Sequence, residues 1–126
     1  MSSQLTVYKA SAGSGKTFTL AREYMTLVIE NPRAYRTILA VTFTNKATEE
    51  MKLRILSQLY GIANSLSESN GYLEQIQQAL PHLSVPQIRQ HAAEALNLLI
   101  HNYNYFRVET IDTFFQSVLR NLAREL

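Results

Sequence analysis

The stretch Ala10-Ser11-Ala12-Gly13-Ser14-Gly15-Lys16-Thr17 decides the fold of this 126-residue chain. It fits the phosphate-binding loop pattern, with Ala10 in the place of the first glycine and Gly15-Lys16-Thr17 as the fixed end. Small residues let backbone N–H groups turn inward around a phosphate, and the helix that follows points the positive end of its dipole at the same charge. We therefore expect Lys16 to reach the β- and γ-phosphates of a nucleotide and the Thr17 hydroxyl to ligate Mg²⁺.

The segments on either side of this loop have the structure that the motif requires. Residues 5–9 alternate and are rich in β-formers, which predicts a short strand. Residues 18–29 carry apolar side chains at helical spacing. A Gly/Ser turn that binds nothing is the alternative. It is disfavoured because the lysine, the hydroxyl and both flanking elements agree.

The rest of the chain predicts further strands that alternate with helices. Residues 37–44 (TILAVTFT) are almost continuously apolar, as parallel strands between helices tend to be. Residues 46–63 and 72–80 predict helices, and another helix is expected to begin with Ser84 as its cap. Residues 105–110 predict a strand, followed by a last helix capped by Asp112 or Thr113. This order predicts an α/β fold with a partial parallel sheet and helices on both faces.

Composition limits the classes of protein that the chain can belong to. The length allows one domain, and no apolar run approaches the roughly 18 residues of a membrane span, so a cytoplasmic protein without a membrane partner is expected. The absence of cysteine excludes disulfides and thiolate metal sites. The net charge of +2 does not by itself indicate nucleic-acid binding. Eight of the twelve basic residues lie in residues 1–63, against four acidic ones, which is compatible with a polyanionic partner.

Two polar stretches follow predicted strands and could contact a ligand, because open α/β sheets bind ligands beyond the carboxyl ends of their strands. The first holds hydroxyl, amide, ammonium and aromatic groups, namely Thr42, Phe43, Thr44, Asn45 and Lys46. Such groups contact phosphates and stack on unpaired bases, but a strand end followed by a capped helix explains the stretch equally well. The second holds Thr110 and Thr113, where a helix cap with core phenylalanines is the stronger interpretation. Tyr103 and Tyr105 could also stack on bases, although packing in the core and sheet is the simpler expectation.

In their order, the three motifs ASAGSGKT, VTFTNKATEEMKLRI and TIDTFFQSVLR resemble the UvrD/Rep/RecB group of superfamily 1 DNA helicases. They look like motifs I, Ia and Ib of that family, and the long helical stretch between the last two looks closest to the RecB- and AddA-like helicase–nucleases. The resemblance implies a RecA-like P-loop fold, ATP and Mg²⁺ as cofactors, and single-stranded DNA as a partner. The residues implied in ATP binding are Ala12, Gly13, Ser14, Gly15, Lys16, Thr17 and Phe18, with Lys16 and Thr17 in catalytic roles. The residues implied in DNA contact are Thr42, Phe43, Thr44, Asn45, Lys46, Thr110 and Thr113.

The resemblance also has departures that shape the functional expectation. Gln4 stands too close to the loop for the adenine-reading glutamine of the family, and Asp112 occupies the place of the histidine common in motif Ib. The later motifs of the motor are absent from these residues. We therefore expect residues 1–126 to be an incomplete amino-terminal motor domain (1A), with a helical insertion at about 64–104.

This expected domain would be the ATP-binding part of a DNA helicase or helicase–exonuclease of recombination and repair. We expect it to be inactive without the remainder of that chain and prone to self-association. The alternatives are a stand-alone nucleotide- or DNA-binding P-loop module and a small P-loop phosphotransferase. No lid-like loop or arginine cluster follows the glycine loop to support the last of these.

Overall fold

A parallel sheet of three short strands lies at the centre of the fold. The computed structural model describes residues 4–7 and 14–125, with side chains from residue 17 onward. The strands are β1 (Gln4–Val7), β2 (Ile38–Thr42) and β3 (Arg107–Thr110), arranged in the order β1-β2-β3. The register places Val7 opposite Val41, and Thr42 opposite Thr110. The three strands therefore end together at one edge of the sheet.

Most of the chain is helical. The helices are α1 (Ser14–Glu30), α2 (Asn45–Ala63), α3 (Asn70–Ala79), α4 (Val85–His101) and α5 (Ile111–Glu125). Three short 3₁₀ segments complete the order, η1 (Pro32–Thr37), η2 (Ser67–Ser69) and η3 (Tyr103–Tyr105). The strands and helices predicted from the sequence are confirmed, with boundaries that differ by a few residues. The second half of the first predicted strand, residues 8–9, lies outside the described residues.

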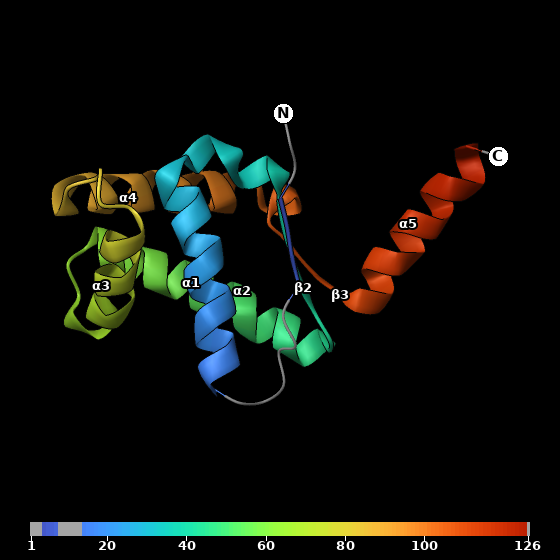
Figure 1. Ribbon diagram of the computed structural model, residues 1–126, viewed down its shortest axis with the longest axis horizontal. Coiled ribbons are helices and arrows are strands. Elements are labelled where there is room, and N and C mark those ends of the chain that lie inside the picture. The colour runs from blue at the N-terminus through green and yellow to red at the C-terminus, as the bar shows by residue number, and fades with distance from the viewer. Residues whose placement is uncertain (1–3, 8–13, 126) are drawn as a thin grey trace.

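The hydrophobic core lies between one face of the sheet and a helical body made of α1, α2, α3 and α4 (Figure 1). The predicted apolar face of α2 is fully buried, with Met51, Ile55 and Leu59 at 0% exposure. Helix α4 crosses α1 and α2 and adds Ile88, Ala92, Ala95 and Leu99 to the same core. The sheet contributes Ile38, Ala40 and Val108. The apolar side chains that recur every three or four residues thus form the buried side of each helix.

The start of α4 is fixed by a capping box. The Ser84 hydroxyl accepts a hydrogen bond from the Gln87 backbone N–H at 3.3 Å, and the Gln87 side chain accepts from the Ser84 N–H at 2.8 Å. The two bonds satisfy backbone donors that would otherwise lack a partner at the first turn. The predicted cap at Ser84 is therefore confirmed.

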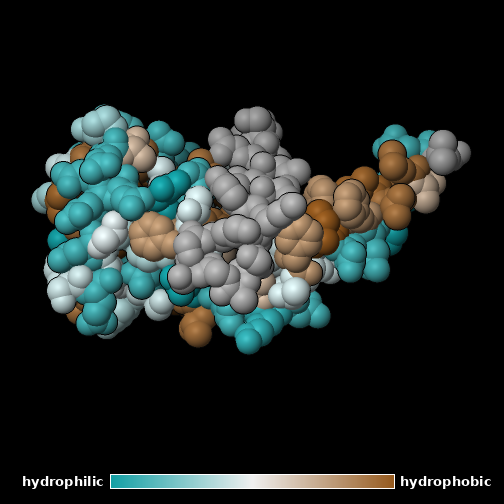
Figure 2. Space-filling view, turned by 60° about the horizontal axis from the view of Figure 1, so that its bottom comes forward, coloured by the Kyte–Doolittle hydropathy of each residue, from teal (hydrophilic) through white to brown (hydrophobic). Residues whose placement is uncertain are grey.

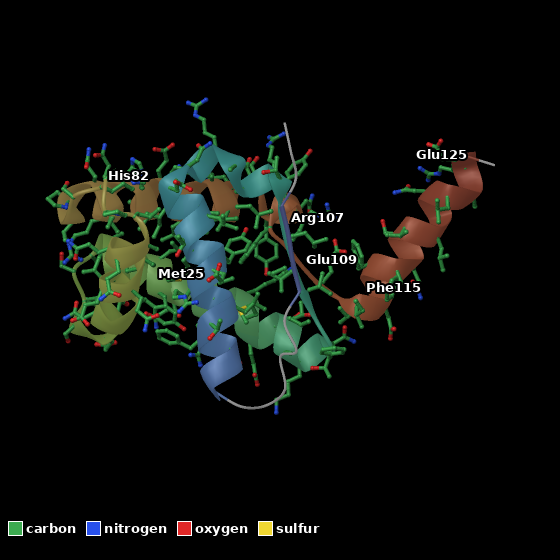
Figure 3. The ribbon with its side chains drawn as sticks, in the orientation of Figure 1. Met25, His82, Arg107, Glu109, Phe115 and Glu125 are labelled. Carbon is green, nitrogen blue, oxygen red and sulfur yellow. The ribbon has the colours of Figure 1, made fainter. Side chains whose placement is uncertain are left out.

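The expected helices on both faces of the sheet are not found as packed layers in the described part of the chain. Helix α5 leaves the end of β3 and extends away from the rest of the molecule (Figure 1), and none of its residues is buried. On that side of β3, Arg107 donates from Nε to Glu109 Oε2 at 3.1 Å, and both side chains project together (Figure 3). The expectation was wrong because an amphipathic pattern predicts a helix, but not which surface that helix covers.

Two local expectations near β3 also need correction. Neither Asp112 nor Thr113 is the cap of α5, because the Thr110 side chain accepts the hydrogen bond from the Thr113 backbone N–H at 3.2 Å. Tyr103 and Tyr105 do not pack in the core or the sheet. They lie in η3, just before the strand, and are 47% and 45% exposed.

No helix in the described part of the chain is both long enough and apolar enough to cross a membrane.

Candidate functional site

The carboxyl edge of the sheet gathers the three motifs. Helix α1 begins shortly after β1, α2 begins three residues after β2, and α5 follows β3 directly. The amino-terminal ends of these helices therefore lie toward the same edge, at the bottom of the view in Figure 1. Each helix start carries a partial positive charge from its unpaired N–H groups. An anion bound close to one of these helix starts would be stabilised by it.

Only the end of the predicted phosphate-binding loop lies within the described residues, where it forms the first turn of α1. Ala12 and Gly13 lie outside the described residues, whereas Ser14, Gly15 and Lys16 form the beginning of the helix. Thr17 follows in the same turn and is partly exposed. Its position one residue after the lysine, at a helix start on the carboxyl edge, fits a hydroxyl ligand to a nucleotide-bound Mg²⁺.

The ring of Phe18 packs against α3. The ring stacks on Tyr72 of α3, with ring centroids 4.1 Å apart and planes inclined by 18°. Arg54 of α2 donates from a terminal guanidinium nitrogen to the Tyr72 hydroxyl at 3.4 Å. Phe18 can therefore contribute only its backbone N–H to nucleotide binding.

Thr42 is an internal residue of the strand end. It is 1% exposed, and its hydroxyl lies 2.6 Å from the Thr48 hydroxyl on the first turns of α2. Its burial argues against direct DNA contact by this side chain. Thr48, which sequence reasoning did not select, is the partner that connects the strand end to the helix; the only signal for it is its place six residues after Thr42.

The residues after Thr42 are exposed. Thr44 is the cap of α2, because its hydroxyl accepts from the Ala47 N–H at 3.0 Å. The capped-helix interpretation of this stretch is thus confirmed. Phe43 is 46% exposed although it follows a buried strand, and Asn45 and Lys46 are also exposed. Lys46 Nζ lies 4.0 Å from Glu50, at the limit of an ion pair, so its ammonium group remains available to an anion.

Thr110 and Thr113 form a local pair at the start of α5. The Thr110 hydroxyl donates to the Thr113 hydroxyl at 3.0 Å in addition to capping the helix. Thr113 is exposed and Thr110 only partly so. The pair keeps one hydroxyl at the same edge as Phe43 and Lys46.

The histidines do not form a metal centre. Among the described residues no group of three or more His, Asp or Glu side chains is placed to hold a metal ion. His91 Nδ1 contacts the Ile29 carbonyl, and His101 Nδ1 lies 2.8 Å from the Asn97 carbonyl. These contacts position α4 against the end of α1 and complete a helix turn.

Comparisons with known proteins show the family of the chain. Residues 1–126 match the family model described as the UvrD/REP helicase N-terminal domain. RecB of the RecBCD enzyme from Borreliella burgdorferi is 34% identical over 111 residues, which cover 87% of this chain and 9% of the relative. RecB from Mycolicibacterium smegmatis is 27% identical over 118 residues, covering 94% of this chain and 10% of the relative.

A shorter match extends the similarity beyond RecB. The ATP-dependent DNA helicase PcrA from Bacillus subtilis is 52% identical over 50 residues, which cover 40% of this chain and 7% of that protein. No solved structure matches the chain significantly. The chain thus spans about a tenth of the length of the curated relatives that it matches.

Proposed function

Because the chain belongs to the UvrD/REP helicase N-terminal domain family, we propose that it forms the ATP-binding part of an ATP-dependent DNA helicase or translocase. The observation that carries the proposal is the position of the start of α1, which follows β1 in the chain. It brings the end of the ASAGSGKT motif to the carboxyl edge, where β2 and β3 present their polar residues.

In this proposal the nucleotide lies over the first turn of α1. The backbone N–H groups of residues 12–18 surround the β-phosphate, and the dipole of the 17-residue helix stabilises its charge. Lys16 contacts the β- and γ-phosphates, and Thr17 ligates Mg²⁺. The metal would neutralise charge between the phosphates, which is its usual contribution to phosphoryl transfer.

Single-stranded DNA would pass along the ends of β2 and β3. Phe43 offers a half-exposed ring for a base, while Asn45, Lys46 and Thr113 supply polar groups for the backbone. Thr42, Thr44 and Thr110 hold this edge in shape through their internal hydrogen bonds. β2 and α2, which carry the proposed DNA residues, both pack against α1, which begins at the proposed nucleotide site. The two proposed sites are therefore connected by direct packing.

The similarity to RecB supports a finer proposal. We assign the chain to a cytoplasmic helicase–exonuclease of DNA recombination and repair, in which residues 64–104 form a helical insertion of domain 1A. The insertion contains α3 and α4, and α4 packs on both α1 and α2. The remainder of such a protein would be this domain's first partner.

Nucleotide binding is tested by thermal unfolding with and without Mg²⁺-ATP. A ligand that binds the folded state raises the melting temperature by mass action, so we expect a rise for the 126-residue chain and none for Lys16→Ala. Lys46→Ala is the matched control, because it removes one exposed lysine from the same edge outside the loop. An equal rise in Lys16→Ala and in the parent chain would contradict the proposed site.

DNA contact is tested by fluorescence anisotropy with a labelled single-stranded oligonucleotide. Loss of one stacked base costs about 1–3 kcal/mol, so Phe43→Ala should weaken binding by roughly fivefold or more. Tyr60→Ala removes a similarly exposed aromatic ring from the last turn of α2 and should leave the affinity unchanged. If the two variants bind alike, Phe43 has no part in the DNA site.

A further inference from the structure

A second exposed surface carries paired cations and aromatic rings at the opposite edge of the sheet. We propose that this surface, formed by Arg36, Lys52, Tyr103 and Tyr105, binds single-stranded nucleic acid. We call it the tyrosine–cation surface. Arg36, Tyr103 and Tyr105 lie where η1 enters β2 and η3 enters β3, and Lys52 reaches them from α2. The candidate ATP and DNA residues lie where these strands end. Strands of four and five residues separate the two regions by about 15 Å.

Each exposed tyrosine of this surface has a cation over its ring. The Arg36 guanidinium carbon lies 4.4 Å from the centre of the Tyr105 ring, and Lys52 Nζ lies 4.8 Å from the centre of the Tyr103 ring. Both distances are within the range of an attractive cation–π interaction. The rings nevertheless remain 45% and 47% exposed, so surface is left on each for a further contact.

Neighbouring side chains hold Tyr103 and Arg36 in place. Tyr103 meets Phe106 edge-on at 5.8 Å between ring centroids, and Phe106, which is 2% exposed, packs on Tyr24 in the core at 5.5 Å. Arg36 is fixed by a 3.0 Å hydrogen bond from its Nε to the Tyr35 hydroxyl, which raises the pKa of Arg36. Fixed rings and a fixed guanidinium lose little conformational entropy when a ligand binds.

No acidic side chain in the described part of the chain compensates the positive charges of this surface. Among the described residues, neither Arg36 nor Lys52 has an acidic side chain within ion-pair distance, whereas Arg107 close by is paired with Glu109. The surface therefore attracts anions, and its two cations keep donors free for phosphate oxygens.

This chemistry fits single-stranded nucleic acid better than a protein. Lysine is depleted from the centres of protein interfaces, which instead need an apolar centre. Phe106, the apolar ring that Tyr103 contacts, is buried and offers no such centre. A groove of cations with aromatic rings is the usual composition of sites for unpaired strands, whose bases stack on the rings while the phosphates meet the charges. A duplex would not expose its bases to these rings.

The test measures anisotropy of labelled oligo(dT), oligo(rU) and a duplex of matched length with the 126-residue chain. The main variant is Tyr103→Ala/Tyr105→Ala, and a second variant, Arg36→Gln/Lys52→Gln, keeps both rings. Tyr60→Ala/Arg124→Gln is the matched control, because it removes one exposed ring and one exposed cation outside both proposed DNA sites. Thermal unfolding of each variant shows that it is folded.

We expect Tyr103→Ala/Tyr105→Ala and Arg36→Gln/Lys52→Gln each to bind oligo(dT) at least fivefold more weakly than the parent chain. The control variant should lose less affinity. Binding to the duplex should be weaker than to the single strands, and the DNA and RNA arms identify the preferred strand. The proposal is overturned if folded Tyr103→Ala/Tyr105→Ala and Arg36→Gln/Lys52→Gln bind as the control does, or if the chain binds no oligonucleotide. It does not depend on ATP binding, so a normal Mg²⁺-ATP shift in these variants separates it from the proposed function.

Discussion

At the scale of single residues, neighbours at the end of β2 have opposite roles. Thr42 is buried and bonded to Thr48, while Phe43 beside it is half exposed. In a strand, consecutive side chains point to opposite sides, and the strand ends at this point. The sequence predicted that residues 42–46 either contact a ligand or form a strand end and a helix cap. It does not separate the two roles, because polar or aromatic side chains suit both. Only the hydrogen bonds separate the residues that shape the edge from those that a ligand can reach.

Tyr24 carries a buried hydroxyl without a hydrogen-bond partner among the described residues. Its ring is 2% exposed and packs on Phe106. Because the buried hydroxyl has lost its water without gaining a partner, Tyr24→Phe should raise the free energy of unfolding by about 1 kcal/mol. Urea unfolding at neutral pH measures the change, and a loss of stability would mean that the hydroxyl has a partner.

The same residue predicts a dependence of stability on pH. Burial raises the pKa of Tyr24 above its usual value. The folded state therefore keeps the proton more tightly than the unfolded state does, and this contribution is complete below the ordinary pKa of about 10. Above that pH the unfolded state loses the proton first, so the free energy of unfolding falls as the pH rises. Tyr24→Phe should reduce this fall, measured by urea unfolding between about pH 9 and 11, whereas Tyr60→Phe on an exposed face of α2 should not.

At the scale of elements, the sequence predicted what depends on local spacing. The apolar positions of α2 and α4 recur every three or four residues, and these positions are buried. The cap at Ser84 is likewise a local pattern and was predicted, whereas the part of Gln87 in the capping box was not. The cap of α5 was misassigned because Thr110, Asp112 and Thr113 are all good caps, and the strand boundary decides among them.

Gly61 and Gly71 differ in the space that the structure leaves for a side chain. A Cβ at Gly61, near the end of α2, would lie 1.9 Å from Ser69 Oγ and 2.9 Å from Ser69 Cβ, whereas a Cβ at Gly71 in α3 would meet nothing within 4 Å. Gly61→Ala should therefore destabilise the chain by about 1–3 kcal/mol. Gly71→Ala should stabilise it by about 0.5–1 kcal/mol, because alanine lowers the entropy cost of the helix.

Chemical denaturation of the two variants measures this difference directly. The double variant Gly61→Ala/Ser69→Gly removes the clashing side chain, and it should recover part of the stability lost in Gly61→Ala. Equal stabilities for Gly61→Ala and Gly71→Ala would show that α2 and η2 are not in close contact.

At the scale of the whole molecule, the surface is unevenly divided. The helical body is mostly hydrophilic outside, while apolar side chains gather along α5 (Figure 2). The apolar face of α5 consists of Phe115, Val118, Leu119 and Leu122, all of them exposed. The sequence predicted the helix and expected its phenylalanines in the core, but not their exposure, because the surface that covers a helix is a property of the assembled molecule.

We expect the 126-residue chain to self-associate through this face. Apolar side chains at positions 111, 115, 118 and 122 follow the alternating four- and three-residue spacing of helices that pack side by side. Leu119, at 63% exposure, contributes little to the stability of the monomer, so Leu119→Glu should leave the thermal unfolding temperature nearly unchanged. The same change places a charge within the apolar face and should therefore shift the chain toward monomer in sedimentation velocity over a range of concentrations. Asn121→Glu adds the same charge to α5 beside the face and should leave the oligomeric state as it is. An association that is equally strong in both variants would have to use another surface, and the tyrosine–cation surface could then be tested with the Tyr103→Ala/Tyr105→Ala variant.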